Sequence, residues 1–311
     1  MIDFKHYSVM ANEATNALEC KSGKIYVDAT LGGGGYSKLI LEKIQPEGQL
    51  FSFDVDDDAI NASKERLREY QNLTIVKSSY TNIKKILQEH NIHKITGGVV
   101  FDLGASFHQL TCAERGFSFM SDAPLDMRFN KESDFSAYDV VNSYPEDRLI
   151  YIFQNYGEER FTKTIASAIV KQRKIAPIKT TKELVELIKL STPKIKSKIH
   201  PATKVFQAIR IEVNSELSNI EKTIEEVIHI LDVNAIISVV SFHSLEDRIV
   251  KQLFKKYSAN CRCEKNKPFC ECGGALLEVV NKKPIIATDK EISENPPSRS
   301  AKLRVARKIK D

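Results

Sequence analysis

Four consecutive glycines, Gly32–Gly35, narrow the folds open to this chain of 311 residues. They follow a β-rich apolar run, Lys24–Ala29, and precede an amphipathic segment, Tyr36–Ile44, whose pattern predicts a helix. Glycine lets backbone approach a ligand where a Cβ would clash, and the start of a helix presents free N–H groups. The order of strand, glycine turn and helix therefore predicts a loop that holds a nucleotide-type cofactor.

Short β-rich runs separated by helical patterns continue through the first 104 residues. The further strands that we expect are Gln49–Asp54, Leu73–Lys77, Gly98–Leu103 and, much later in the chain, Ala235–Phe242. Strands that alternate with helices form a parallel sheet with right-handed crossovers, and ligands bind beyond the carboxyl ends of its strands. The strands end in polar or acidic residues, so the sheet edge that would receive a ligand is polar.

The pattern changes between the fourth and fifth strands, where the sequence shows helices and loops but no convincing strand. Thr180 and Glu183 have the spacing of a capping box for a helix over Thr180–Leu190, and one long helical stretch is expected over Phe206–Leu231. The fold class is therefore α/β. We expect a discontinuous Rossmann-like domain, residues 1–108 and 204–311, with an inserted helical substrate-recognition domain, residues 109–203.

The glycine loop fits more than one class of nucleotide cofactor. A dinucleotide fingerprint needs a third glycine where Tyr36 and Ser37 stand, and no G-K-[ST] is present for a P-loop. Asp54 stands twenty residues after Gly34, where a carboxylate can accept the ribose hydroxyls of NAD or S-adenosylmethionine equally. The alternative is a tight turn without a ligand, in which Asp54 caps the next helix.

An aromatic side chain and a further acid separate these cofactor classes. Tyr80 follows the third strand and Asp102 ends the fourth, positions that suit an adenine ring and a methionine ammonium group. Each residue alone has an ordinary structural explanation. Together with the missing third glycine, they favour an S-adenosylmethionine-dependent methyltransferase over an NAD-dependent dehydrogenase.

Seven unusual stretches occur in one order along nearly the whole chain: HYSVMANEA, DATLGGGGYS, ERGFSFMSDAPLDMRF, YGEERF, HPATKVFQAIRIEVNSEL, SFHSLEDRIVK and ENPPSRSAKLRVA. By these stretches the chain resembles the bacterial 16S ribosomal RNA cytosine-N4 methyltransferases, the MraW-like family. The resemblance implies a Rossmann-like methyltransferase domain with a helical insertion. It also implies S-adenosylmethionine as cofactor and methylation of the N4 amine of a cytidine in the decoding region of the small subunit.

The family's cofactor contacts carry over, position by position, onto Gly34, Gly35, Tyr36, Asp54, Tyr80, Asp102 and Gln109. Two departures from the family pattern stand out. Tyr36 occupies a place where the family usually has histidine, so a backbone contact survives and an imidazole-specific contact does not. The family's Ser-Ser-x-Gln-Leu-Asp after the fourth strand is SFHQLT here, residues 106–111, which keeps Gln109 but loses a hydroxyl and a carboxylate.

The implied reaction needs the cytosine amine to be held in position, and it requires no metal. The lone pair of the cytosine N4 amine is delocalised into the ring, so positioning and acceptors for the amino hydrogens would supply the acceleration. We expect Asp102 and His243 to be the catalytic residues, His243 lying in the segment Ser241–Arg248 beyond the fifth strand. In the alternative interpretation, Glu246 and Asp247 cap the following helix. Pro124–Arg128 is a second candidate for contact with the target.

Four cysteines near the C-terminus offer a candidate zinc site. Cys261, Cys263, Cys270 and Cys272 could enclose one ion tetrahedrally, but their C-x-C spacing is tighter than the usual C-x₂-C. Four free thiols in a reducing compartment are the alternative. We therefore do not assign zinc, and none of the expected site residues is a metal ligand.

The distribution of charge favours a polyanionic partner. The formal net charge is +5, and residues 163–204 hold eleven Lys or Arg residues against two acids, with further basic residues after Pro296. Such clusters are typical of nucleic-acid contact, although a solvated basic face needs no partner. With the resemblance, they predict 16S ribosomal RNA within the small ribosomal subunit as partner, bound through the insertion and the tail.

Features that the sequence lacks bear on the location of the protein and on its other possible functions. No apolar run reaches the roughly 18–20 residues that span a bilayer, and no signal-peptide pattern is visible, so we expect a cytoplasmic protein without a membrane partner. A homodimer is left open. The alternatives are a non-catalytic RNA-binding ribosome-assembly factor, or a methyltransferase acting on another nucleic acid or a small molecule. The intact loop with Asp54 and Asp102 argues against the first of these.

Overall fold

The computed structural model describes residues 8–104, 112–193, 200–263, 271 and 273–311. The chain divides into two compact units: unit 1 is Met1–Gly104 with Leu217–Asp311, and unit 2 is Ala105–Glu216. The second boundary therefore follows the whole of helix α10 (Ala202–Val213) instead of falling at residues 203–204. None of the helices in the described ranges is long and apolar enough to cross a membrane.

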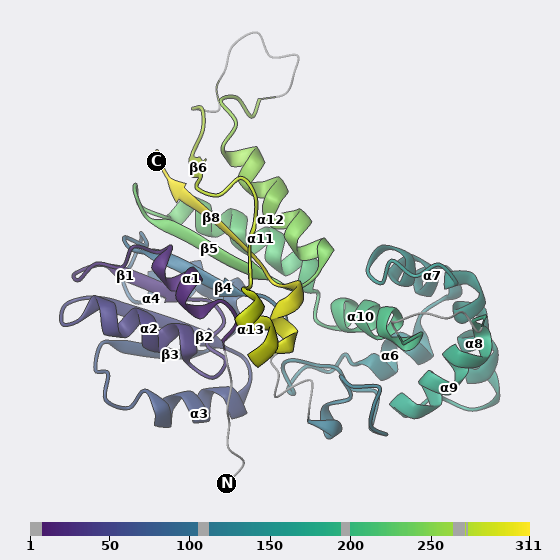
Figure 1. Ribbon diagram of the computed structural model, residues 1–311. Coiled ribbons are helices and arrows are strands. Elements are labelled where there is room, and N and C mark those ends of the chain that lie inside the picture. The colour runs from purple at the N-terminus through teal and green to yellow at the C-terminus, as the bar shows by residue number, and fades with distance from the viewer. Residues whose placement is uncertain (1–7, 105–111, 194–199, 264–270, 272) are drawn as a thin grey trace. The chain divides into compact units, whose positions relative to one another are not determined.

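Unit 1 is built on an eight-stranded sheet (Figure 1). The strands are β1 (Ile25–Asp28), β2 (Gln49–Asp54), β3 (Leu73–Lys77), β4 (Gly98–Asp102), β5 (Ile236–Ser241), β6 (Leu277–Val279), β7 (Ile285–Ile286) and β8 (Lys302–Lys308). They lie in the order β3-β2-β1-β4-β5-β8-β6, with β7 paired to β8. β1 to β5 pair in parallel, which confirms the five expected strands, and β6, β7 and β8 pair antiparallel.

Helices cover both faces of this sheet (Figure 1). Successive residues of a strand face opposite sides, so neighbouring residues of one strand pack in different cores. The helices of unit 1 are α1 (Ala11–Asn16), α2 (Gly35–Ile44), α3 (Asp57–Arg66), α4 (Ile83–Glu89), α11 (Glu216–Ile230), α12 (Ser244–Tyr257) and α13 (Asp289–Glu294). Val27 and Phe101 pack in a core with residues of α4, α11 and α12. Tyr26 and Val100, one residue earlier in each strand, pack in a second core with residues of α1, α2 and α3. The carboxyl ends of β1, β2, β4 and β5 therefore share one edge of a rigid, two-sided sheet.

The basic C-terminal tail is a buried strand, β8, and not a free arm. Arg304 Nε lies 2.6 Å from Asp247 Oδ1, and the Lys308 ammonium group donates to the Ile228 carbonyl at 2.7 Å. Burial alone would raise the pKa of Asp247, but Arg304 and Lys302 hold it below its usual value. These tail charges serve the fold, so the expectation that they contact RNA is wrong for Arg304 and Lys308.

Unit 2 is helical in its described part and has its own apolar core. Its helices are α6 (Ala137–Ser143), α7 (Glu146–Asn155), α8 (Thr162–Ile175), α9 (Thr181–Ser191) and α10. The predicted capping box is present: Thr180 Oγ1 accepts from the Glu183 N–H at 3.3 Å, and Glu183 Oε2 accepts from the Thr180 N–H at 3.2 Å. The single helix expected over 206–231 is wrong, because α10 stops at Val213 and Ser215 takes a left-handed φ of 51°.

Candidate functional site

The glycine loop of unit 1 is held in shape by side chains from β2 and α3. Asp54 Oδ2 accepts from the Gly32 N–H at 2.8 Å, and its Oδ1 accepts from the next two backbone N–H groups of its own turn, at 2.8 and 3.0 Å. Arg66 Nη1 donates to the Gly33 carbonyl at 2.7 Å, and Ser63 Oγ donates to the Gly32 carbonyl at 2.8 Å. Asp54 thus faces the loop, and Asp56 is the residue that caps α3.

The last two glycines of the loop are required by packing within the protein. Gly34 has a φ of 73°, and an added Cβ would come within 3.0 Å of Leu67 Cδ1. At Gly35 an added Cβ would come within 2.0 Å of Ser8 Oγ. The protein itself therefore fills the space beside the Cα atom of both residues, and the contact of their backbone with a cofactor stays a prediction.

The two aromatic residues expected at the cofactor site have different surroundings. Tyr36, the second residue of α2, is only 1% exposed, and its hydroxyl donates to the Val9 carbonyl. Tyr80 begins the 3₁₀ turn Tyr80–Asn82, is half-buried, and lies edge-on to Phe101 with ring centroids 6.0 Å apart. A half-buried ring at the edge of the sheet can still offer part of its surface to a ligand, whereas the Tyr36 ring is enclosed by protein.

A chain of hydrogen bonds joins the ends of β1 and β4, through residues that sequence reasoning did not single out. Asp28 is fully buried; its Oδ2 accepts from Ser37 Oγ at 2.7 Å, and its Oδ1 accepts from the Thr30 N–H at 3.1 Å. Thr30 Oγ1 in turn accepts from the Asp102 N–H at 2.7 Å. Burial raises the pKa of Asp28 to about 6. The acidic end of β1 was a visible signal for Asp28, but nothing in the sequence marked Thr30.

Asp102 ends β4 and carries a carboxyl group with a strongly raised pKa. Its Oδ1 is buried and has no hydrogen-bond partner among the described residues. Burial, followed by the negative charges of Asp28 and Glu246, raises its pKa well above the usual value. A buried acceptor among other acids is costly unless a donor or a cation meets it. The arrangement therefore suits a positively charged or N–H-bearing ligand.

His243 lies beyond β5 at the start of α12, with its ring held by the helix cap. Its Nδ1 accepts from the Glu246 N–H at 3.4 Å, while Glu246 Oε2 accepts from the N–H groups of Phe242 and His243 at 2.8 and 3.2 Å. The ring proton then lies on Nε2. This nitrogen is 3.0 Å from Glu246 Oε1, but it makes no hydrogen bond within the described part of the chain. The alternative in which Glu246 caps this helix is confirmed, and the cap presents His243 as an N–H donor. An added Cβ on Gly104, just after β4, would lie 3.8 Å from Glu246 Oε1.

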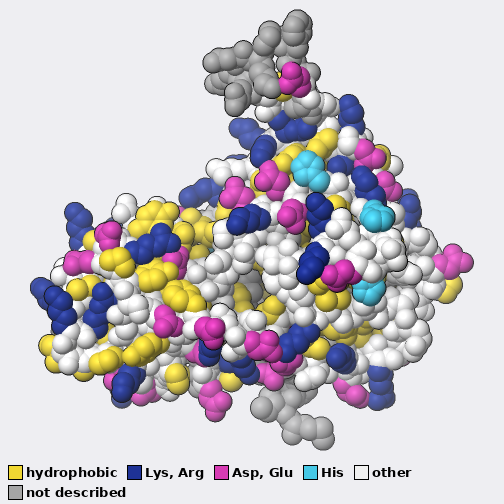
Figure 2. Space-filling model, turned by 180° about the vertical axis from the view of Figure 1, so that it is seen from behind, with side chains coloured by type: hydrophobic (Ala, Val, Ile, Leu, Met, Phe, Trp, Pro, Cys, Tyr) yellow, Lys and Arg dark blue, Asp and Glu magenta, His cyan; other side chains and the backbone are white. Residues whose placement is uncertain are grey.

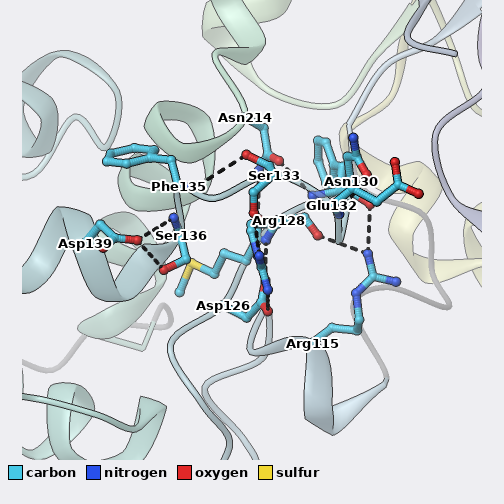
Figure 3. Close-up of polar contacts among 12 residues, drawn as sticks. Arg115, Asp126, Arg128, Asn130, Glu132, Ser133, Phe135, Ser136, Asp139 and Asn214 are labelled. Atoms are coloured by element: carbon cyan, nitrogen blue, oxygen red, sulfur yellow. Dashed lines mark hydrogen bonds and ion pairs between the residues drawn. The ribbon is translucent and has the colours of Figure 1, made fainter.

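The candidate target loop of unit 2, Pro124–Arg128, is held by its own polar groups (Figure 3). Arg128 donates to Asp126 through Nε and Nη2 at 2.9 and 2.7 Å, and to the Ser133 carbonyl through Nη1 at 2.5 Å. Arg115 and Asn214 bind backbone groups of the same loop at 2.8–3.0 Å. The Arg128 guanidinium group therefore maintains the shape of the loop, and contact of this segment with the target stays a prediction.

Several expected positions lie outside the described residues. They are Gln109 with the rest of 106–111, the lysines at 194, 196 and 198, and two of the four clustered cysteines, Cys270 and Cys272. Of the other two, Cys261 is exposed, and Cys263 Sγ accepts from the Glu271 N–H at 3.3 Å. Two described cysteines do not test a four-thiolate zinc site.

Comparison with known proteins finds full-length relatives. Residues 3–309 match the MraW methylase family. The chain is 50% identical to Ribosomal RNA small subunit methyltransferase H of Clostridium botulinum (strain Loch Maree / Type A3) over 310 residues, 99% of this chain and 100% of the relative. It is 48% identical to the protein of that name from Clostridioides difficile (strain 630), with the same coverage. Among solved structures, an rRNA methylase from Streptococcus thermophilus aligns with a TM-score of 0.42 at 10% identity, over 96% of this chain and 95% of that one.

Because Asp28 is buried, we expect it to lower the free energy of unfolding in a pH-dependent way, and Asp28→Asn should remove this effect. Between about pH 4 and pH 6 the folded protein holds a proton that the unfolded chain has released, so the contribution of Asp28 to stability falls as pH rises. A shift of roughly two pKa units corresponds to a fall of roughly 3 kcal/mol in the free energy of unfolding across that window. Urea unfolding from pH 4 to 7.5 should show the variant gaining stability relative to the parent as pH rises. The exposed Asp57→Asn is the matched control, and parallel curves for parent and Asp28→Asn would contradict the assignment.

Proposed function

The chain belongs to the MraW methylase family, and we propose that it transfers a methyl group from S-adenosylmethionine to the N4 amine of a cytosine in 16S ribosomal RNA. Full-length relatives named Ribosomal RNA small subunit methyltransferase H support small-subunit RNA as the substrate class. The finer assignment, N4 of a cytosine in the decoding region, rests on the resemblance in sequence to the cytosine-N4 methyltransferases.

The observation that carries the proposed cofactor is the buried, unsatisfied Oδ1 of Asp102. S-adenosylmethionine supplies an electrophilic methyl group on a sulfonium and also carries an ammonium group. It therefore brings positive charge to Asp102, which the negative charges of Asp28 and Glu246 already face. Asp54, oriented toward the glycine loop, would accept from the ribose hydroxyls, and Tyr80 would pack against the adenine. Asp102 would then orient the charged end of the cofactor and line the reaction centre.

The chemistry is a single displacement in which the N4 nitrogen forms a bond to the methyl carbon as the carbon–sulfur bond breaks. The sulfonium becomes a neutral thioether, and one proton leaves the nitrogen, with the Asp102 carboxylate as its proposed first acceptor. Asp102 offers an acceptor for the amino hydrogens, and His243 offers an N–H donor through Nε2 for an acceptor on the base. Holding both partners in line supplies much of the acceleration, and no metal is needed.

Labelled S-adenosylmethionine, incubated with the protein and either small ribosomal subunits or naked 16S RNA, tests this function. Nucleoside analysis should recover the label in N4-methylcytidine. Asp102→Asn keeps the size of the side chain and removes its charge, so turnover should fall at least roughly a hundredfold, the low end for a lost electrostatic contact.

Other outcomes of that experiment would contradict the proposed reaction. RNA binding without incorporation would favour a non-catalytic assembly factor, and label in another nucleoside would move the target. Unchanged turnover in Asp102→Asn would reduce Asp102 to a structural residue.

Asp54→Ala should abolish or strongly weaken S-adenosylmethionine binding, because it removes both the proposed ribose acceptor and the anchor of Gly32. Isothermal calorimetry measures the dissociation constant, and thermal unfolding checks that the variant stays folded. Asp57→Ala is the control, since Asp57 is exposed and pairs at the surface with Lys77 at 3.0 Å. Equal affinity for Asp54→Ala and Asp57→Ala would remove Asp54 from the cofactor site.

We propose that RNA contact falls on the basic surface of unit 2. Six lysines on α8, α9 and the connection between them are exposed: Lys163, Lys171, Lys174, Lys179, Lys182 and Lys189. Figure 2 shows Lys and Arg side chains among hydrophobic and acidic ones on one face of unit 2. Of these six lysines, Lys189 forms an ion pair within the described residues, with Glu186 at 2.9 Å. Such a surface supports phosphate binding, which releases counterions.

Replacing Lys171, Lys174 and Lys182 by Gln should weaken RNA binding and flatten its salt dependence. Removing one lysine–phosphate interaction lowers the slope of log K against log salt by about 0.7–0.9. The same triple replacement in unit 1, at the exposed Lys64, Lys84 and Lys85, is the matched control. Affinity for S-adenosylmethionine should stay unchanged in both. If the two variants bind RNA alike across a salt series, the α8–α9 lysines are only solvated.

A further inference from the structure

Two partly exposed aromatic rings of unit 2 lie flat against each other. The Phe119 ring stacks on the His200 ring, with centroids 4.7 Å apart and an interplanar angle of 12°. Phe206, from the core of unit 2, supports Phe119 edge-on at 5.6 Å, and Met120, the next residue of the loop, is 81% exposed. We call the stacked pair the Phe119–His200 platform. Its orientation is fixed from the core, and part of its surface is open to solvent.

The loop that carries the first of these rings is attached to the start of α9. Thr181 Oγ1 donates to the Ser121 carbonyl at 2.7 Å, and it accepts from the Ala123 N–H at 3.1 Å. The Thr181 N–H donates in turn to the Ala123 carbonyl at 2.8 Å. Lys179 and Lys182 are exposed on either side of Thr181 in the sequence. Positive charge therefore lies next to the attachment of this loop.

The start of α10 fixes the ring of His200. Its Nδ1 accepts from the Ala202 N–H at 3.2 Å, so the proton of the neutral ring lies on Nε2. Burial and the charge of Lys189 lower the pKa of His200, which favours the neutral ring at neutral pH. His200 therefore offers a flat, uncharged ring that is held in place by a backbone N–H group.

We propose that the Phe119–His200 platform binds an unpaired base of the substrate RNA by stacking, while the neighbouring lysines bind the phosphates of that strand. The inference rests on the proposed function, which makes RNA the substrate. Single-stranded RNA is recognised by bases that stack on aromatic rings, histidine included, and every base has a flat face for this contact. The exposed lysines match the charge of the phosphates that accompany each base, so these surroundings favour RNA over an apolar segment of a protein.

Two substitutions separate the ring of His200 from its hydrogen bond to α10. His200→Asn keeps an acceptor for the Ala202 N–H, because asparagine is a favoured residue at helix starts, but it removes the ring. His200→Phe keeps a ring and removes the acceptor. Stacking predicts that His200→Asn binds a short single-stranded RNA at least roughly fivefold more weakly, the low end for one stacked base, and that His200→Phe binds it like the parent.

A third substitution removes the other ring of the platform. Phe119→Leu keeps an apolar side chain against the core, and it should weaken RNA binding as His200→Asn does. Fluorescence anisotropy of end-labelled RNA measures the dissociation constants, and thermal unfolding checks that each variant stays folded.

A second RNA separates stacking from phosphate binding. An oligonucleotide of the same length whose riboses carry no bases keeps the phosphates, so His200→Asn should bind it like the parent. The slope of log K against log salt should also be the same for the two proteins, since no phosphate contact is lost. Equal weakening for both RNAs, weakening for neither, or His200→Phe binding as weakly as His200→Asn would overturn the inference.

Methylation of 16S RNA by the parent, measured alongside, tests the proposed function separately. Methylation by the parent, with RNA binding that His200→Asn and Phe119→Leu leave unchanged, would overturn the platform and support the proposed reaction. Binding that follows the expected pattern of variants, without any methylation by the parent, would support the platform and overturn the proposed reaction.

Discussion

Three carboxyl groups lie near one another beyond the carboxyl ends of β1, β4 and β5: Asp28, Asp102 and Glu246. Asp28 and Glu246 are buried, and so is the Oδ1 atom of Asp102, and this withdrawal of like charges from water is the constraint on which the site depends. Charges of one sign cannot be gathered away from water without compensation. Asp28 is compensated by hydrogen bonds from Ser37 and Thr30, and Glu246 by the N–H groups at the start of α12. Asp102 is left with a buried oxygen that the described residues do not satisfy. The edge is thereby prepared for a ligand that brings donors or positive charge.

The sheet makes this concentration of acids possible. Parallel pairing of β1, β4 and β5 brings the residues that end these strands to one edge, although they are far apart in sequence. Asp54 at the end of β2 extends the same edge and holds the glycine loop through Gly32. Because Asp54 and α3 fix the loop and Ser8 closes over Gly35, the loop is preformed. A cofactor would therefore meet a glycine loop that is already ordered, which lowers the entropic cost of binding.

The parallel strands and the capping box of α9 could be predicted from sequence because each depends on local pattern alone. Apolar β-rich runs bounded by turns predict buried strands, and the spacing of Thr180 and Glu183 predicts a helix start. β8 was missed because its Arg and Lys residues indicate a solvated basic tail. The charges of Arg304 and Lys308 are neutralised or buried only by distant partners, Asp247 and the end of α11. Thr30 was missed for the same reason, since its hydroxyl matters through an acceptor contact to the backbone of Asp102, 72 residues away. Long-range polar pairs leave no periodic trace in the sequence.

The central claim is that this acidic edge is built for a cationic methyl donor and not for a dinucleotide. Calorimetry measures this preference directly, when the full chain is titrated with S-adenosylmethionine and, separately, with NAD. The account predicts saturable binding of S-adenosylmethionine at one site per chain and no measurable binding of NAD at the same concentrations. Tight binding of NAD with no binding of S-adenosylmethionine would contradict it.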